Sequence, residues 1–432
     1  MGVIRNVIGV LLILIVAYLL SGNRKEVKNR IPNILVMFVL ILVIAFISLR
    51  TSLGITILTR ISDFFSWLNE QAAVGVDFVF GGIQIEGGAS VFFFNVLLPI
   101  IFFSALIGIL DYLKILPLLM KAIGWLINKL LGVGELEGQY SIMTTMVGQP
   151  TVYVTIADQI RNMSGKRLFT FLLVSTSTVS AAMLAAYMEM IPGEYVVVAV
   201  LLNIFAAFII SSIINPYDVD EENTIMQENM AHESIGVVNT EARNDSEDVE
   251  KVEEVNEIDN PSEAEGEERQ NLISVISDYI SNGWDMAVSI AATMIGFVAL
   301  ITFLNSGLET IVGISFTEIV GYVFSPVAFL IGVPTEDIVQ VGSVMAQKLF
   351  TNEFVALSEA GSLAGQISEK SLAMISVYSM SFANLGTLGI IQGGIKSISK
   401  SKANEVSGYL GKILVGSILS SLLVAAIVGM FF

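Results

Sequence analysis

The chain alternates long apolar stretches with short polar segments. A helix needs about 20 mostly apolar residues to cross the hydrocarbon layer of a bilayer. Eight stretches meet this requirement, so the pattern predicts an all-α polytopic membrane protein with eight transmembrane helices. These stretches are residues 3–20, 33–49, 97–113, 168–188, 193–214, 285–304, 371–392 and 408–431.

Basic loops predict the orientation of these helices. The first stretch is followed at once by a basic loop, residues 23–30, and lacks an A-x-A cleavage site, so we expect it to be retained. Short basic loops stay in the cytoplasm. Counting eight crossings from this loop places a second basic loop, residues 396–402, in the cytoplasm as well. We therefore expect a multi-pass membrane protein with both termini extracellular.

Composition supports the membrane prediction, whereas the net charge is a local feature. The chain is 54% hydrophobic and 14% charged, whereas soluble domains contain about 25% charged residues. Residues 217–269 carry 19 acidic and three basic residues, and thus account for 16 of the 18 net negative charges. This composition predicts a disordered, acidic cytoplasmic linker over residues 216–270. A tether is favoured over a docking site for a basic partner, and scattered basic residues give no basis for nucleic-acid binding.

Two segments have the wrong character for simple crossings. Residues 131–160 open with an apolar-Gly-Val turn and the carboxylate of Glu135, and then reach a polar cluster at Gln149. Residues 331–365 open in the same way, with Glu336, and reach Glu353. Apolar arms flank both clusters, so we expect each segment to enter the membrane and return as a re-entrant hairpin. Residues 54–68, with apolar positions at helical spacing, are predicted instead to form an interfacial helix.

Each predicted hairpin is followed by an apolar stretch with a polar centre. Gln149 precedes Thr178 by 29 residues, and Glu353 precedes Asn384 by 31. The order of hairpin, interrupted helix and helix thus occurs twice, in opposite orientations because an odd number of crossings separates the copies. Inverted repeats with broken helices are typical of secondary transporters, whose substrates bind where the repeats meet.

These repeats predict how the chain is divided. We expect mainly scaffold and interfacial helices first, then the first repeat, the acidic cytoplasmic linker, a crossing scaffold helix and the second, inverted repeat. The corresponding boundaries are 1–130, 131–215, 216–270, 271–330 and 331–432.

The polar residues at these interruptions are the candidate binding groups. A carboxylate inside a membrane is costly and usually functional, so Glu353 is the strongest candidate. With Asn384 it suits a polyhydroxylated ligand, whereas Gln149 and Thr151 can hydrogen-bond a heterocycle. Asn384 and the Ser and Thr residues have a structural alternative, as bonds between helices or to nearby carbonyls. Lys348 either pairs with Glu353 or extends to the membrane surface.

Composition also limits the chemistry. The chain has no cysteine and one histidine, His232, in a polar segment. We therefore expect no cofactor, no resident metal beyond a coupling ion and no catalytic residue. An intramembrane enzyme that pairs Glu353 with Asp158 or Glu336 is the alternative from another class, although the sequence lacks a nucleophile elbow and a phosphate loop. A passive channel is a further alternative, against which the duplicated hairpins argue.

Several of these segments resemble the concentrative nucleoside transporter family, and its bacterial nucleoside permeases in particular. Residues 351–356, Thr-Asn-Glu-Phe-Val-Ala, are similar to the family's second-hairpin motif. Residues 381–384, Ser-Phe-Ala-Asn, are similar to its broken-helix motif, and Gly148-Gln149 to its first-hairpin motif. The likeness includes residues 78–82 and 101–106 and covers nearly the whole chain apart from the acidic linker.

The resemblance implies a homotrimer that imports nucleosides together with a cation by an elevator-like movement. It also implies a division of the site, in which Glu353 and Asn384 bind the ribose hydroxyls and Gln149 and its neighbour face the base. Phe382 and Thr387 would line the same pocket, although Phe382 alone would be interpreted as packing. The expected partners are the nucleoside, membrane lipid and further copies of the chain.

The sequence departs from the family pattern at two places. After Gln149 the family has Ser or Thr and then Glu, whereas this chain has Pro150 and Thr151, which leaves the base preference open. Import of modified nucleosides or related conjugates is therefore an alternative. In sodium-coupled members an Asn side chain helps to hold the cation, but Thr144 stands there in this chain. The other matching cation positions are Val147, Thr178 and Val179. A small hydroxyl residue at position 144 resembles proton-coupled members, so a proton is favoured over sodium.

Overall fold

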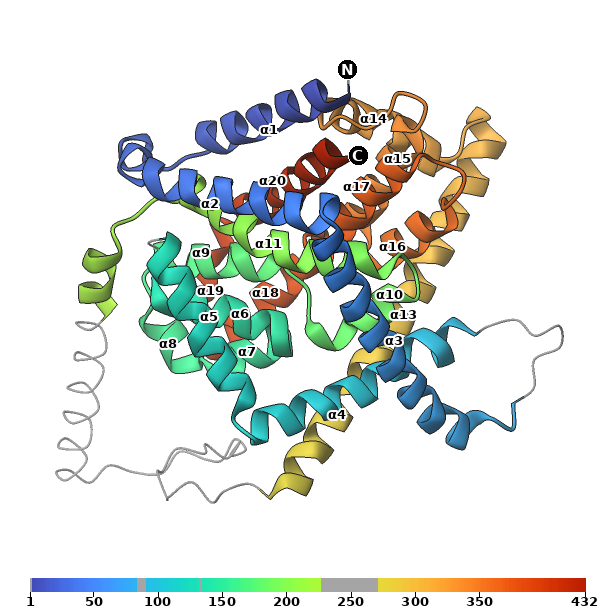
Figure 1. Ribbon diagram of the computed structural model, residues 1–432, viewed down its shortest axis with the longest axis horizontal. Helices are drawn as coiled ribbons and strands as arrows, with labels where there is room; N and C mark the ends of the chain where they lie inside the picture. Colours follow the sequence, from blue (N-terminus) through green and yellow to red (C-terminus); the bar gives the residue numbers. More distant parts are fainter. Residues whose placement is uncertain (1, 84–90, 132–133, 227–270) are drawn as a thin grey trace, which may run out of the picture.

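The computed structural model describes residues 2–83, 91–131, 134–226 and 271–432 (Figure 1). Within these ranges every regular element is a helix, which confirms the all-α prediction. The elements in chain order are α1 (Gly2–Leu19), α2 (Arg24–Arg50), α3 (Ser52–Phe80), η1 (Phe93–Leu97), α4 (Pro99–Tyr112), α5 (Ile115–Leu131), α6 (Glu135–Val147), α7 (Gln149–Thr155), α8 (Ala157–Asn162), α9 (Gly165–Thr176), η2 (Ala181–Met183), α10 (Leu184–Met188), α11 (Gly193–Ile214), α13 (Leu272–Val312), α14 (Phe316–Leu330), α15 (Ile338–Phe350), α16 (Glu353–Ser362), α17 (Glu369–Ser379), α18 (Leu385–Ile398), α19 (Lys400–Ser407), α20 (Leu410–Val428) and η3 (Gly429–Phe431).

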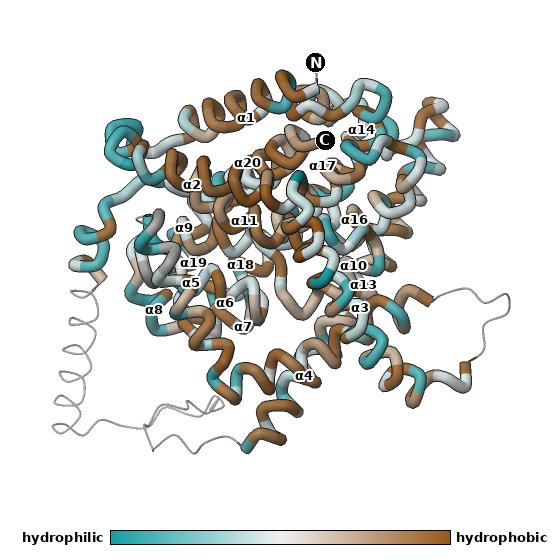
Figure 2. Tube along the Cα trace, viewed as in Figure 1, coloured by the Kyte–Doolittle hydropathy of each residue, from teal (hydrophilic) through white to brown (hydrophobic). Residues whose placement is uncertain are grey.

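Seven helical segments of the described chain are long and apolar enough to cross a membrane. They correspond to seven of the eight predicted stretches, and Figure 2 shows the apolar character of α1, α2 and α20. The eighth stretch, residues 371–392, is divided into α17 and α18 by non-helical residues between Ser379 and Leu385. Its apolar length is therefore present, but not as one helix.

The centre of the molecule is formed by α9, α11 and α20. Most residues of these helices are buried, and their apolar residues point in all directions, as expected for helices surrounded by others. A Cβ at Gly416 of α20 would lie 2.5 Å from a methyl carbon of Leu173 in α9, so glycine permits this close packing. By contrast, α1, α2 and α13 expose many apolar side chains, which lipid or neighbouring subunits must cover.

Both predicted hairpins are pairs of short helices. The first consists of α6 and α7, which meet at Gly148. The φ of Gly148 is +91°, in the left-handed region that favours glycine. The second consists of α15 and α16, and Asn352 caps α16 because its Oδ1 accepts a hydrogen bond from the Val355 N–H at 3.0 Å. Residues 132–133, part of the turn expected to open the first hairpin, lie outside the described residues.

Contacts at the outer ends of the hairpins show that the repeats are inverted. Beyond the first hairpin, the Met163 carbonyl accepts a hydrogen bond at 2.6 Å from Lys402, in the second basic loop. Before the second hairpin, the Ile331 carbonyl accepts one at 2.7 Å from Asn6, near the amino terminus. Asn6 also accepts a hydrogen bond from Lys370, which follows that hairpin. The hairpins thus start at opposite ends of the molecule, and both termini lie at the same end (Figure 1).

Two segments differ from their predicted extents. The interfacial helix expected over residues 54–68 is the longer α3, which continues to Phe80 because no proline or turn sequence interrupts it. The predicted linker begins with ordered residues rather than a tether. Tyr217 donates a hydrogen bond to Glu137 at 2.9 Å, and Glu137 forms a fully buried ion pair with Arg167 at 2.6 Å. Residues 227–270 of that linker, including His232, lie outside the described residues.

Candidate functional site

A cavity of about 610 Å³ lies where the two hairpins meet. This volume is in the range of small-molecule sites, which is about 300–1,000 Å³. Gln149 and Glu353, at its wall, are the first residues of α7 and α16, so each hairpin directs the amino-terminal end of a helix at the cavity. All six predicted substrate-binding residues line it, and they are Gln149, Thr151, Glu353, Phe382, Asn384 and Thr387.

Glu353 and Asn384 form a preassembled pair on one side of the cavity. The Asn384 amide donates to Glu353 Oε2 at 3.4 Å, and the Tyr187 hydroxyl donates to Glu353 Oε1 at 3.2 Å. Asn384 is fixed in turn as the cap of α18, because its Oδ1 accepts hydrogen bonds from the Thr387 N–H at 2.9 Å and hydroxyl at 3.2 Å. The carboxylate and the amide are thus held side by side, with oxygen atoms that can accept hydrogen bonds from adjacent hydroxyl groups.

Gln149 is oriented by the break in the first repeat. Its amide nitrogen donates long hydrogen bonds to Ser175 at 3.5 Å and Thr176 at 3.4 Å, at the end of α9. Its amide oxygen makes no hydrogen bond within the described part of the chain and is available as an acceptor. Thr151 adds a half-buried hydroxyl to the cavity wall, and the Pro150 side chain lies outside the described residues. This half of the site therefore offers mainly neutral acceptors.

Phe382 connects the two broken helices. Its backbone N–H donates to the Thr178 carbonyl at 3.2 Å, so the break between α17 and α18 satisfies a backbone group freed by the break after α9. Its ring lines the cavity beside Asn384. This position allows the ring to contact a bound base.

The four predicted cation-binding residues lie on two neighbouring elements. Thr144 and Val147 belong to the last turns of α6, and Thr178 and Val179 to the break after α9. The hydroxyls of Thr144 and Thr178 donate to the carbonyls of Tyr140 and Ser175, at 2.9 and 3.3 Å. Their oxygen lone pairs remain as possible cation ligands, whereas the Thr178 carbonyl already accepts the Phe382 N–H.

Lys348 follows neither of its two predicted roles. It is fully buried, and its ammonium donates to the Tyr378 carbonyl at 2.5 Å and the Ser381 hydroxyl at 2.6 Å. It also donates to Ser421 at 3.3 Å. The ammonium therefore satisfies the carbonyl at the end of α17, where the helix is interrupted. The spacing in the sequence is a signal for a position inside the protein. Lys348 precedes Glu353 by five residues, just as Thr144, a predicted cation-binding residue, precedes Gln149 by five.

One wall of the cavity comes from α13, which sequence reasoning treated only as a crossing helix. Its lining residues follow one helical face, at steps of three or four positions. The polar ones are Asn282, Asp285, Ser289 and Thr293. A polar row in an apolar helix is a signal that could have indicated this wall from the sequence. Tyr187 was also not predicted, because it lies on α10, far along the chain from the Glu353 that it contacts.

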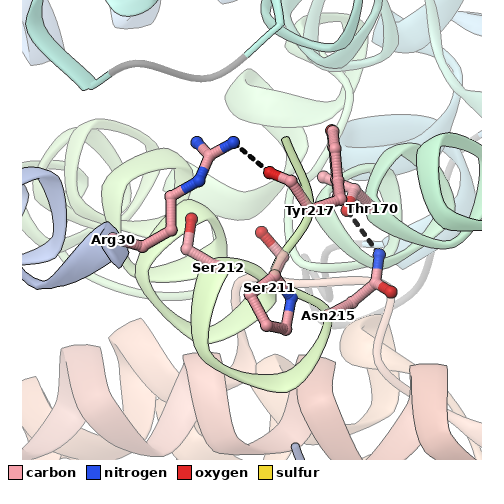
Figure 3. A pocket seen from close by; sticks show the side chains of 7 residues that line it. Arg30, Thr170, Ser211, Ser212, Asn215 and Tyr217 are labelled. Carbon is pink, nitrogen blue, oxygen red and sulfur yellow. Dashed lines mark hydrogen bonds between the residues drawn. The ribbon is translucent and has the colours of Figure 1, made fainter. Parts of the chain in front are cut away.

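The acid–base pair of the enzyme alternative is not assembled. Asp158 is highly exposed and pairs with Arg161 at 2.7 Å, and Glu336 is exposed beside Thr335. Neither lines the cavity that holds Glu353. Figure 3 shows a second, very small pocket of about 10 Å³ beside Arg30 and Tyr217, which has room for about one water molecule.

Family comparisons cover most of the chain. Residues 8–83 and 195–429 match the N-terminal and C-terminal models of a family described as Na⁺ dependent nucleoside transporters. Residues 93–193 match a model described as nucleoside recognition. The purine nucleoside transport protein NupG of Bacillus subtilis (strain 168) is 34% identical, over 99% of this chain and 98% of NupG. The nucleoside permease NupC of Helicobacter pylori (strain ATCC 700392 / 26695) is 27% identical, over 99% of this chain and 97% of NupC.

Solved structures share the whole fold. The inward-facing, substrate-bound structure of CNTnw has a TM-score of 0.83 and 27% identity, and the match covers 100% of this chain and 98% of CNTnw. A CNTnw variant in an outward-facing state has a TM-score of 0.84 with the same coverage. These relatives are transporters rather than enzymes, and their alignment extends over every element that builds the cavity. The chain therefore belongs to the concentrative nucleoside transporter family and is a multi-pass membrane protein.

Proposed function

We propose that this protein imports purine nucleosides by cation-coupled symport. The observation that carries the proposal is the Glu353–Asn384 pair, which faces a cavity bounded by both hairpin tips. Its acceptors suit the ribose hydroxyls, while Gln149 and Thr151 face the base and Phe382 and Thr387 complete the pocket. The purine preference is supported by the similarity to NupG over nearly its full length.

We propose an elevator-like mechanism in which both repeats move as one body. Solved structures of CNTnw in inward-facing, intermediate and outward-facing states support such a movement. Hydrogen bonds from Asn6 tie α1 to the second repeat, so we place α1, together with α2, in the moving body rather than in the scaffold. The scaffold would then centre on α4 and α13, which pack closely because a Cβ at Gly283 would meet Ile101 and Ser104 at 2.8–2.9 Å.

The apolar outer face of α13 supports the proposed homotrimer. Ile295 and Phe303 are each 72% exposed in the single chain, and a scaffold helix of this kind is suited to contacts with neighbouring subunits. We also propose that both termini lie outside the bacterial cell membrane, because both short basic loops are expected in the cytoplasm.

We propose a proton as the coupling ion, with sodium as the alternative. Thr144 provides a hydroxyl where sodium-coupled members have an amide, and this hydroxyl already donates to the Tyr140 carbonyl. The family description as Na⁺ dependent favours sodium. Uptake into proteoliposomes under an imposed proton or sodium gradient distinguishes the two ions.

Replacing Thr151 with Glu is expected to change the base preference. The new carboxylate would face the cavity from the first hairpin and would accept hydrogen bonds from base N–H groups, each such charged bond contributing about 1.5–3 kcal/mol. Competition by a panel of purine, pyrimidine and modified nucleosides measures the change, with Thr155→Glu as an exposed control on the same helix. If both variants keep the wild-type order of competitors and the wild-type response to cations, position 151 does not contact the base.

A further inference from the structure

Asp285 is a carboxylate that the proposed site does not use. It lines the cavity from α13, at the start of the apolar part of that helix, and its side chain is exposed to the open space. It makes no hydrogen bond or ion pair with any residue that the structure describes. A charged group at membrane depth is costly, and those that persist generally face a cavity and serve a function.

Three buried acidic groups of the described chain have partners. Glu353 accepts hydrogen bonds from Tyr187 and Asn384, and Glu137 pairs with Arg167. Asp337 accepts three, from the Ser368 N–H and the hydroxyls of Ser368 and Ser371. Each of these three carboxylates thus has hydrogen-bond donors within the fold, whereas Asp285 presents its acceptors only to whatever occupies the cavity.

The packing of α13 fixes the direction of Asp285. Gly283 faces α4 at close range, since an added Cβ would lie 2.8 Å from the Ser104 hydroxyl. Two residues on, a helix has turned by about 200°, so Asp285 points away from α4 and into the cavity. Six residues before it, Tyr279 donates to Asp111 of α4 at 3.2 Å and fixes the rotation of α13.

The same contacts show which end of α13 lies on the side of the first hairpin, whose tip we propose faces the base. The beginning of α13 lies beside the end of α4, and α4 leads through α5 to the first hairpin, where Gly124 packs on Gln139 of α6. The end of α13 is joined to α14, and Ile331, directly after α14, accepts a hydrogen bond from Asn6 beside the second hairpin. Asp285 is in the first half of α13. It therefore lies on the same side of the cavity as the outer end of the first hairpin, whose tip carries Gln149.

We propose that Asp285 determines base selectivity by accepting hydrogen bonds from N–H donors on the edge of the nucleobase, an inference that rests on the proposed nucleoside transport. Among the described side chains of the first hairpin that line the cavity, the acceptors are the Gln149 amide oxygen and the Thr151 hydroxyl. A carboxylate is acceptor-only and can take two parallel N–H bonds. The ring N1–H and adjacent amino group of guanine match it, and the N1–H of hypoxanthine matches in part. Adenine offers a single donor, its amino group, beside a lone pair at N1 that a carboxylate repels, so it cannot form the two parallel bonds.

The test measures competition for uptake by wild-type protein, Asp285→Asn and Asp285→Glu in proteoliposomes. Guanosine, inosine, adenosine and 1-methylinosine are the competitors, because methylation removes the N1–H donor. Asp278→Asn is the matched control, since Asp278 is an exposed carboxylate seven residues earlier on the same helix, and does not line the cavity. Asp285→Asn is expected to weaken guanosine competition by about 10–100-fold, the range of one charged hydrogen bond, and to change adenosine less than about 3-fold.

In wild-type protein, 1-methylinosine is expected to compete about 10-fold more weakly than inosine, and this difference should vanish in Asp285→Asn and persist in Asp285→Glu and Asp278→Asn. Equal competition by inosine and 1-methylinosine in wild-type protein would overturn the proposal even if no variant inserts into the membrane. So would an equal loss for all competitors in Asp285→Asn. A wild-type protein that takes up no nucleoside at all would instead reject the proposed function itself.

Discussion

Replacing Glu353 with Gln is expected to reduce nucleoside uptake by at least about 100-fold while leaving membrane insertion normal. A charged hydrogen bond contributes about 1.5–3 kcal/mol, and the carboxylate would accept two from a ribose. The substitution also conflicts with the neighbours of Glu353. Tyr187 and Asn384 each donate to one of its two oxygen atoms, and the amide nitrogen of Gln would face one of these donors.

Uptake and direct calorimetric titration of nucleoside measure this effect. Glu359→Gln is the matched control, because Glu359 belongs to the same helix but does not line the cavity. It should transport at the wild-type rate. Near-normal binding and uptake by Glu353→Gln would show that the ribose lies elsewhere.

Replacing Lys348 with Met should cause the second large effect, on both stability and uptake. The variant leaves the Tyr378 carbonyl without its donor, at a cost of about 1–3 kcal/mol for a buried unpaired acceptor. The Ser381 and Ser421 hydroxyls can still bond each other, as they do at 2.8 Å. Because the residues that follow carry Asn384, we expect disorder at this break to displace the amide and to reduce uptake by more than about 10-fold.

Thermal unfolding in detergent and uptake in proteoliposomes together measure the role of Lys348. Lys396→Met, which alters an exposed lysine on α18, provides the control and should leave both quantities unchanged. Lys348→Met protein with the stability and transport of the control would mean that the ammonium does not hold the interrupted helix.

The sequence predicted those features that depend on local composition. Eight apolar stretches were recognisable by length, and seven correspond to candidate spans, of which the one over residues 165–188 is interrupted after α9. Both hairpins were predicted from polar clusters between apolar arms, because a polar group at membrane depth requires a special structure. The site residues Gln149, Glu353 and Asn384 were found for the same reason, since each interrupts an apolar run.

Features that depend on contacts between distant segments were not predictable. The direction of the Lys348 side chain is set by Tyr378, Ser381 and Ser421, which follow it by 30 to 73 residues. The ordered start of the acidic linker depends on the Glu137 carboxylate, 80 residues before Tyr217. Composition could not indicate this contact, because the surrounding segment has the charge density of a disordered chain.

Asp285 is a residue whose role the sequence alone did not indicate. The helix pattern of α13 was visible, but its polar row has meaning only once the hairpin tips are known to lie opposite. A single Asp at the edge of an apolar stretch is otherwise interpreted as the boundary of a crossing helix.

Gradient-driven uptake by the purified protein tests the central claim most directly. Labelled guanosine, inosine, adenosine or uridine would be added outside proteoliposomes that carry an inward proton gradient, an inward sodium gradient or no gradient. We predict saturable accumulation of purine nucleosides that an imposed proton gradient stimulates and that Glu353→Gln abolishes. Uptake of no nucleoside under either gradient would contradict the account.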